Sequence, residues 1–320
     1  MIKRIPQITN ELEALRAKGL QRGDDTGFEC LNALYSIKQG SYTIFLAAPG
    51  HGKSELEFEL LINQSMKYGK RSLIYSPETG SVPEIVAELV HKYTYKPFYN
   101  KNGYGVGDKE YFEALNWIDH HFLIVDSDEQ SYSMLELFEM VKTFEKENPG
   151  EKIDCIMAEP YNELKHDMKE YNGRQDLYIE DLFGEVRRFC KKNNKHVFIS
   201  FHPAHQQKLD EHGIRYYPMP SAREAAGGQA ALRKAMTWIN MWRPPVGLVG
   251  ENGPYKENEV IITIEKAKPK GVSVKGTCTL YFDWKRNRYY EDKDGTPFYA
   301  FHHEKGQSVL MPSEEFDIPF

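Results

Sequence analysis

The chain has 320 residues, of which 40% are hydrophobic and 28% are charged, and this length buries a full core without disulfides or metal ions. Its 41 Lys and Arg residues against 47 Asp and Glu residues give a net charge of −6, which excludes a histone-like coat of positive charge and limits any nucleic-acid contact to short local patches. No apolar run approaches the ~20 residues that span a bilayer, and the N-terminus is too polar for a signal peptide. We therefore expect a cytoplasmic protein with no membrane partner.

Residues 1–25 are predicted to form an N-terminal linker helix or arm. Asn10 can cap a short helix, in which Leu12, Leu15 and Leu20 make a thin apolar stripe. Because so narrow a stripe rarely stabilises a lone helix, we expect it to pack on the body of the protein or on a neighbouring subunit.

From residue 42 onward, short apolar runs alternate with amphipathic helical stretches. The predicted strands are 42–48, 72–76, 122–125, 155–158, 197–201 and 260–264, and the helices between them include 55–68, 82–93 and 179–192. This alternation predicts an α/β fold in which helices cover both faces of a mainly parallel, twisted sheet. The runs 277–284 and 288–290 are predicted to be antiparallel strands. The predicted domains are therefore the arm, a core at 26–290 and a C-terminal extension at 291–320.

An apolar strand leads into the segment AAPGHGKS at residues 47–54, and a helix follows its Lys-Ser pair. This context is typical of a P-loop, in which glycines let backbone N–H groups close around phosphate oxygens at a helix N-terminus. In such a loop the lysine neutralises the β- and γ-phosphates and the serine hydroxyl ligates Mg²⁺. We predict that a nucleoside triphosphate and Mg²⁺ bind here, with the loop residues Pro49, Gly50, His51, Gly52, Lys53 and Ser54 around the phosphates.

Three later strands end in a polar side chain: Glu78, Glu159 and His202. The carboxyl ends of parallel strands meet at one edge of the sheet, beside the phosphate site, so Glu78 can polarise an attacking water. Glu159 follows the apolar run 155–158 in the layout of a Walker-B strand, where the acid supports Mg²⁺ through water. His202 ends its strand where a side chain can sense the γ-phosphate.

The order of these motifs resembles the RecA-like ATPase domain of hexameric replicative DNA helicases, the DnaB and Twinkle type. The resemblance extends over roughly residues 12–290 and includes the strand that ends in SPETG, the segment DLFGEVRRFCKKNNKHVFISFHPAH, and the late segments SAREAAGGQAALRKAM and ITIEKAKPKG. It implies a RecA-like P-loop NTPase core, ATP and Mg²⁺ as cofactors, and a homo-oligomer, expected to be a hexameric ring with active sites between subunits. It also implies that Lys53 and Ser54 hold the phosphates and the metal, that Glu78 is the base for water, and that Glu159 and His202 are the Walker-B acid and the sensor.

In this family a basic pair on a late strand reaches into the neighbouring subunit's site, and its second member is normally arginine. The matching residues are Lys266 and Lys268, with Lys270 as a fallback after a one-residue slip. A lysine lacks the bidentate guanidinium fork, so a solvated basic turn stays open as the alternative for these three residues.

The family holds single-stranded DNA in the loops after the Walker-B and sensor strands, here about residues 161–175 and 205–223. Both loops contain cations that can follow a DNA backbone without reading its sequence. The candidates are Lys165, Arg174, Lys208, Arg215 and Arg223. Acidic residues in the first loop cancel its positive charge, so an ordinary solvated loop is the alternative.

The leading prediction is therefore an ATP-hydrolysing, ring-forming motor on single-stranded DNA that unwinds duplex DNA. A RecA-like recombinase or recombination mediator that forms filaments on DNA is the first alternative, although a filament former typically has a strand-like polymerisation motif where a helix is predicted here. The second alternative is an ATP-binding assembly or signalling module that acts on protein partners without DNA. The acidic net charge and Lys268 in place of arginine favour this second alternative.

Overall fold

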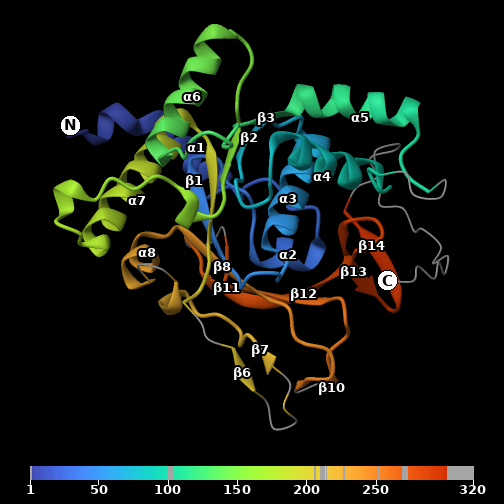
Figure 1. Cartoon of the computed structure of the whole chain (residues 1–320). Helices are drawn as coiled ribbons and strands as arrows, with labels where there is room; N and C mark the ends of the chain where they lie inside the picture. Colours follow the sequence, from blue (N-terminus) through green and yellow to red (C-terminus); the bar gives the residue numbers. More distant parts are fainter. Residues whose placement is uncertain are drawn as a thin grey trace.

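A ten-stranded sheet is the central element of the described residues (Figure 1). The computed structural model describes residues 2–99, 104–204, 207–209, 213, 215–225, 228–250, 253–268 and 273–300. Along the sheet the strand order is β14-β13-β12-β11-β8-β1-β5-β4-β2-β3. The strands from β8 to β3 in this order run parallel to one another. Their bounds are Ser41–Leu46 (β1), Ser72–Tyr75 (β2), Phe122–Ile124 (β3), Cys155–Ala158 (β4), His196–Phe201 (β5) and Thr237–Trp242 (β8).

The other end of the sheet is antiparallel, as predicted for its last strands. It consists of β11 (Glu259–Lys266), β12 (Gly276–Asp283), β13 (Arg288–Lys293) and β14 (Thr296–Tyr299). Strand β13 crosses residue 290, and the sequence analysis did not predict β14, so the sheet ends later than expected. Residues 301–320 of the expected C-terminal extension lie outside the described residues.

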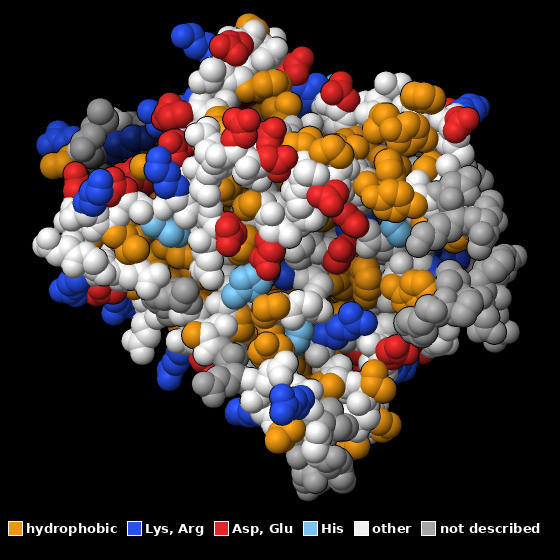
Figure 2. Space-filling view, in the orientation of Figure 1, with side chains coloured by type: hydrophobic (Ala, Val, Ile, Leu, Met, Phe, Trp, Pro, Cys, Tyr) orange, Lys and Arg blue, Asp and Glu red, His pale blue; other side chains and the backbone are white. Residues whose placement is uncertain are grey.

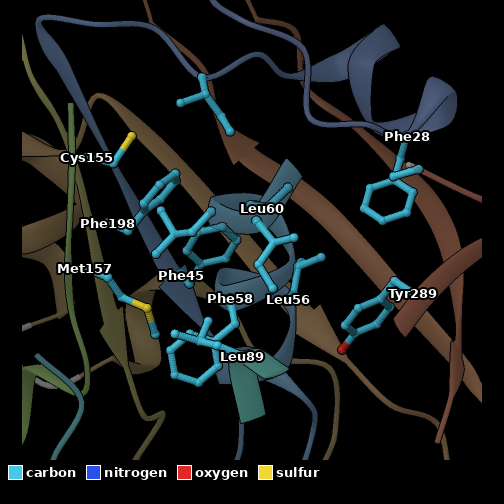
Figure 3. Packing of buried hydrophobic residues seen from close by; sticks show 14 of the residues in the cluster. Phe28, Phe45, Leu56, Phe58, Leu60, Leu89, Cys155, Met157, Phe198 and Tyr289 are labelled. Carbon is cyan, nitrogen blue, oxygen red and sulfur yellow. The ribbon is translucent and has the colours of Figure 1, made fainter. Parts of the chain in front are cut away.

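Helices cover both faces of the sheet, as the alternation of the sequence predicts (Figure 1). Helices α2 (Glu29–Leu34), α3 (Lys53–Tyr68), α4 (Val82–Thr94) and α5 (Asp108–His121) contribute to one buried apolar cluster. Helices α6 (Met134–Glu147), α7 (Gln175–Asn193) and α8 (Gly228–Lys234) contribute to a second one. Neighbouring residues of β1 show the division, because Phe45 lies in the first cluster and Ile44 in the second. Figure 3 shows the first cluster, where Phe45 and Phe198 of the sheet pack with Leu60 of α3.

The N-terminal arm consists of a short 3-10 turn, η1 (Ile5–Ile8), and helix α1 (Thr9–Lys18). The helix begins at Thr9, after the turn, so the predicted capping role of Asn10 is wrong. None of the α1 residues is buried, and Leu12, Leu15 and Leu20 are 42%, 46% and 56% exposed. The apolar stripe therefore does not pack on the body of its own chain, and contact with a neighbouring subunit stays a prediction.

The elements that were not predicted include α5, α6 and β8. Strand β8 contains a polar residue, Asn240, which interrupts the apolar run that would have marked it. The amide of Asn240 is buried but satisfied, because it donates to Glu265 Oε2 at 2.6 Å and accepts from Trp238 Nε1 at 2.8 Å. Among the described residues, no helix is both long and apolar enough to span a bilayer.

Candidate nucleotide-binding site

The predicted P-loop connects β1 to α3 at the carboxyl edge of the parallel strands. Gly50 and Gly52 both have positive φ angles, +75° and +80°, which explains the need for glycine at these two positions. Helix α3 begins at Lys53, as predicted for the Lys-Ser pair. The loop borders a pocket of about 410 Å³, whose lining includes Pro49, Gly50, His51, Gly52, Lys53, Ser54, Glu78 and His202.

The register of the sheet explains why the strand-end residues converge. Tyr75 of β2 pairs with Ala158 of β4, which pairs in turn with Ile199 of β5. The residues that follow these strands therefore leave the sheet at a common edge. Glu159 follows Ala158 directly, so it enters the space beneath the P-loop.

Glu159 is completely buried and contacts both P-loop residues that were expected to act with it. Lys53 Nζ forms an ion pair with Glu159 Oε1, and the Ser54 hydroxyl donates to the same oxygen. The hydroxyl of Ser76, just past β2, donates to the other oxygen at 3.2 Å. A hydroxyl and a carboxylate oxygen are the hard ligands that Mg²⁺ prefers, so Ser54 and Glu159 fit a magnesium site that is completed by phosphate oxygens and water.

Glu78 and His202 lie on another wall of the same pocket. His202 Nε2 lies 2.8 Å from Glu78 Oε2, and His202 Nδ1 lies 3.3 Å from the carbonyl oxygen of Ala47. The Glu78 side chain is half exposed, which leaves its carboxylate accessible from the pocket. The histidine thus joins the predicted base to Ala47, the first residue of the P-loop segment.

A buried acid behind the P-loop, Glu57, was missed by the sequence analysis. Glu57 lies one helical turn beyond Lys53 and is completely buried in α3. Its Oε2 accepts a hydrogen bond from the Ser200 hydroxyl at 2.8 Å. Burial raises the pKa of Glu57 well above its usual range, the charge of Glu159 raises it further, and Lys53 opposes the shift. Glu57 therefore ties α3 to β5 through Ser200, at a buried position where helical periodicity predicts an apolar residue.

His51, predicted to lie around the phosphates, lines the pocket and also contacts neighbouring segments. Its Nδ1 accepts the backbone N–H of Arg243 at 3.3 Å, and its ring meets the Tyr217 ring edge-on with centroids 5.9 Å apart. Burial lowers the pKa of His51 to about 4, with a further contribution from the Arg243 charge. The imidazole is therefore neutral near pH 7.

The late lysines differ in their surroundings. Lys266 Nζ donates to the carbonyl oxygens of Leu232 and Arg233, the latter at 2.8 Å, at the end of α8. Burial lowers the pKa of Lys266 to about 8, with help from the charge of Lys268. Lys268 is exposed, whereas Lys270 lies outside the described residues. Lys266 therefore satisfies two carbonyls of its own chain that the helix leaves free.

The candidate DNA contacts fall into two groups. In the first loop, Lys165 Nζ lies 3.9 Å from Glu136 and Arg174 lies 2.7 Å from Asp176, so acids accompany both cations. The second group begins on a small hairpin that projects from the body (Figure 1), formed by β6 (Lys208–Leu209) and β7 (Arg215–Tyr216). Lys208 and Arg215 are exposed on this hairpin, and Arg223 is exposed in the 3-10 turn η4 (Ala222–Glu224).

Figure 2 shows acidic and histidine side chains gathered at the centre of one face of the molecule, with Lys and Arg scattered around them. No broad positive patch is seen on this face among the described residues. Any DNA contact there is therefore local, as the net charge suggests. The described residues also contain no group of three or more His, Cys, Asp or Glu side chains that could hold a metal ion by themselves.

The sheet order, with a P-loop after β1 and an acid after β4, defines a RecA-like P-loop α/β fold. The ATPase domain of G40P shares this fold, with a TM-score of 0.70 and 15% identity over 90% of this chain and 99% of that one. A DnaB-like replicative helicase, whose structure was determined with its interactions with primase, gives a TM-score of 0.67 and 14% identity over 90% of this chain and 67% of its own. The resemblance to DnaB-type ATPase domains is confirmed.

The sequence is also similar to that of a curated protein, the chloroplastic/mitochondrial Twinkle homolog protein of Arabidopsis thaliana. The two are 26% identical over 201 residues, or 61% of this chain. The chain spans 28% of the length of this relative. No family model matches the chain.

Proposed function

We propose that this chain is an ATP-hydrolysing, ring-forming motor that moves on single-stranded DNA and unwinds duplex DNA, as replicative helicases do. The main support is the contact of Lys53 and Ser54 with Glu159, together with Glu78 and His202 in the lining of the pocket at the same loop. The similarity to Twinkle and DnaB-like proteins supports the same class of activity.

Nucleotide binding begins with the loop backbone, whose N–H groups receive the phosphate oxygens at the start of α3. Lys53 exchanges Glu159 for the β- and γ-phosphates, and this exchange frees the carboxylate of Glu159. Ser54 and Glu159 would hold Mg²⁺, which would supply positive charge beside the phosphates.

Hydrolysis requires a group that orients and deprotonates water beside the γ-phosphate. Glu78 is the base in this proposal, because its carboxylate faces the pocket and stays half exposed. His202 holds Glu78 through the 2.8 Å contact and senses the γ-phosphate. Glu78 and His202 follow β2 and β5 of the same sheet, so a change at the phosphate can reach the segments that follow β5.

Single-stranded DNA is bound by the cations of the two loops after β4 and β5. The projecting β6–β7 hairpin carries Lys208 and Arg215, and their exposure suits contact with a phosphate backbone. In a hexameric ring each subunit repeats this contact. Lys268 is the better candidate for the neighbouring subunit's site, since Lys266 is bound to carbonyls of its own chain.

The decisive experiment measures the ATPase rate with and without single-stranded DNA at several salt concentrations. DNA stimulation that falls steeply with salt supports the DNA motor. Negative-stain imaging then distinguishes closed rings from the open filaments of a recombinase. ATP binding without DNA stimulation or unwinding rejects both DNA proposals.

A second candidate function is an ATP-dependent module that acts on protein partners. The pairing of Lys165 and Arg174 with acids favours it, because paired cations attract a DNA backbone weakly. The same assay separates the two functions, since this module would hydrolyse ATP at a rate that DNA does not change.

A further inference from the structure

A side chain of strand β13 contacts the phosphate loop. Tyr289 of this strand is completely buried, and its hydroxyl donates to the carbonyl oxygen of Gly52 at 2.8 Å. Figure 3 shows the Tyr289 ring beside Leu56 of α3. The two partners are 237 positions apart in the chain.

The carbonyl of Gly52 thereby has two donors. The Leu56 N–H donates to it at 3.0 Å, which is the first hydrogen bond of α3, and the Tyr289 hydroxyl is the other donor. A Cβ atom on residue 52 would lie 2.4 Å from the Tyr289 hydroxyl oxygen, so this contact requires glycine at that position. The close approach of β13 to the P-loop therefore depends on glycine at position 52.

The orientation of this carbonyl fixes the orientation of a phosphate-binding donor. A trans peptide group is planar, with its C=O and N–H pointing in opposite directions. Holding the Gly52 carbonyl toward Tyr289 and Leu56 therefore turns the Lys53 N–H the opposite way, out of the helix start. This N–H is one of the four that the first turn of α3 leaves without an intrahelical partner.

Tyr289 is itself held firmly in place. The preceding residue, Arg288, forms a fully buried ion pair with Glu59 of α3 at 2.7 Å. Arg288 Nη1 also donates to the Lys92 carbonyl oxygen at 3.0 Å, and the ring of Phe282 packs against Tyr289 with centroids 5.0 Å apart. Burial raises the pKa of Tyr289 well above its usual range, so the phenol stays protonated and remains a donor.

We infer that Tyr289 is a positioning residue for the phosphate loop, and that its hydroxyl presets the Gly52–Lys53 peptide for a nucleotide phosphate. The inference rests on the proposed nucleotide site. In this inference Tyr289 acts through the Gly52 carbonyl. The last part of the sheet thus contributes to the proposed phosphate site through the Gly52 carbonyl.

The test compares Tyr289→Phe with Tyr290→Phe in the full chain. Each variant removes one hydrogen-bonded hydroxyl from β13, but that of Tyr290 accepts from Asn258 Nδ2 at 2.7 Å on the other face of the strand. A fluorescent ATP analogue with Mg²⁺ reports the dissociation constant. We expect Tyr289→Phe to raise this constant and the KM for ATP by about 2- to 10-fold, with kcat and the melting temperature nearly unchanged and with Tyr290→Phe at the wild-type value.

Hydrogen exchange of the peptide that contains residues 50–56 gives a second readout without nucleotide. Faster exchange is expected in Tyr289→Phe and not in Tyr290→Phe. Equal affinities for wild type and Tyr289→Phe overturn the inference, as do equal losses in the two variants or a Tyr289→Phe chain that fails to fold. If the wild type does not bind the analogue at all, the proposed nucleotide site itself is rejected.

Discussion

His202 Nε2 lies 2.8 Å from Glu78 Oε2, although the strands that carry them, β5 and β2, are separated in the sheet by β4. This contact lies at the carboxyl edge of the parallel strands, beside the pocket that the P-loop borders. It makes the orientation of Glu78 depend on His202. The two side chains should therefore behave as one unit in hydrolysis.

A double-mutant cycle on Glu78 and His202 tests that unit. Glu78→Gln is expected to keep nucleotide binding and to lower kcat by about 10²- to 10⁴-fold, the usual contribution of a general base. His202→Ala should lower kcat by about 10- to 100-fold, because the base loses the partner that orients it. The double variant should be no slower than Glu78→Gln, since residues that act as a unit are not additive. Additive losses, measured by steady-state ATPase assays, would show that the two residues act independently.

Lys53→Met should abolish nucleotide binding and also destabilise the protein. Removing the ammonium group leaves Glu159 buried without its charged partner, which costs about 3–5 kcal/mol in the free energy of unfolding. The double variant Lys53→Met/Glu159→Gln removes both charges and should recover most of that stability without recovering binding. Chemical denaturation and nucleotide titration of the three proteins measure the two effects separately. Equal stability of Lys53→Met and wild type would contradict the buried ion pair.

Stability should fall in mild acid because of a buried histidine, His196. Burial lowers its pKa to about 4, although a hydrogen bond to the Lys38 carbonyl opposes the shift. In the unfolded chain this histidine takes up a proton near pH 6.5, but in the folded chain it does so only near pH 4. The free energy of unfolding should therefore be unaffected by His196 above pH 6.5 and decrease between pH 6.5 and 4.

Thermal melts at pH 7.5, 6.5 and 5.5 measure this decrease. His196→Gln cannot titrate, so its melting temperature should fall less over the same interval, even if it begins lower. His51, whose pKa is also lowered to about 4, should leave a residual slope in this variant. Parallel curves for wild type and His196→Gln would disprove the assignment.

The hairpin cations should matter more for DNA than those of the first loop. Lys208→Ala/Arg215→Ala is expected to weaken single-stranded DNA binding and to make the log–log salt dependence shallower by about 1.4, or ~0.7 for each lost phosphate contact. Lys165→Ala/Arg174→Ala is the matched control, and its effect should be smaller because acids already accompany both side chains. Fluorescence anisotropy with a labelled oligonucleotide gives both slopes. A larger change in the control would assign DNA binding to the first loop.

Residues that are close in sequence, or that end parallel strands, could be predicted without a structure. Lys53 and Ser54 follow a glycine loop, and Glu159 ends a short apolar run, so local pattern and sheet topology together place them at one edge. The structure does bring these three side chains into contact. Apart from β8, the parallel part of the sheet was predictable for the same reason, because its strands are apolar runs bounded by polar residues.

Contacts between distant segments gave no such signal. Tyr289 approaches Gly52 only because β13 is placed by three successive antiparallel pairings beyond β8. Glu57 resembles an exposed helical glutamate until β5 is packed over it. Strand β8 was not predicted because Asn240 interrupts its apolar run. The hydrogen-bond partners that allow Asn240 to be buried, Glu265 and Trp238, are brought to its side chain by the fold.

The buried contact between Lys53 and Glu159 also bears on which ligands the loop accepts. The ammonium group already has an internal counter-ion, so an arriving anion must compete with a carboxylate of the protein itself. When sulfate displaces Glu159 from Lys53, the buried Glu159 carboxylate is left without a positive partner. A polyphosphate that binds with its own divalent cation supplies a positive charge beside this carboxylate. We therefore expect the loop to discriminate against simple anions before any sugar or base is recognised.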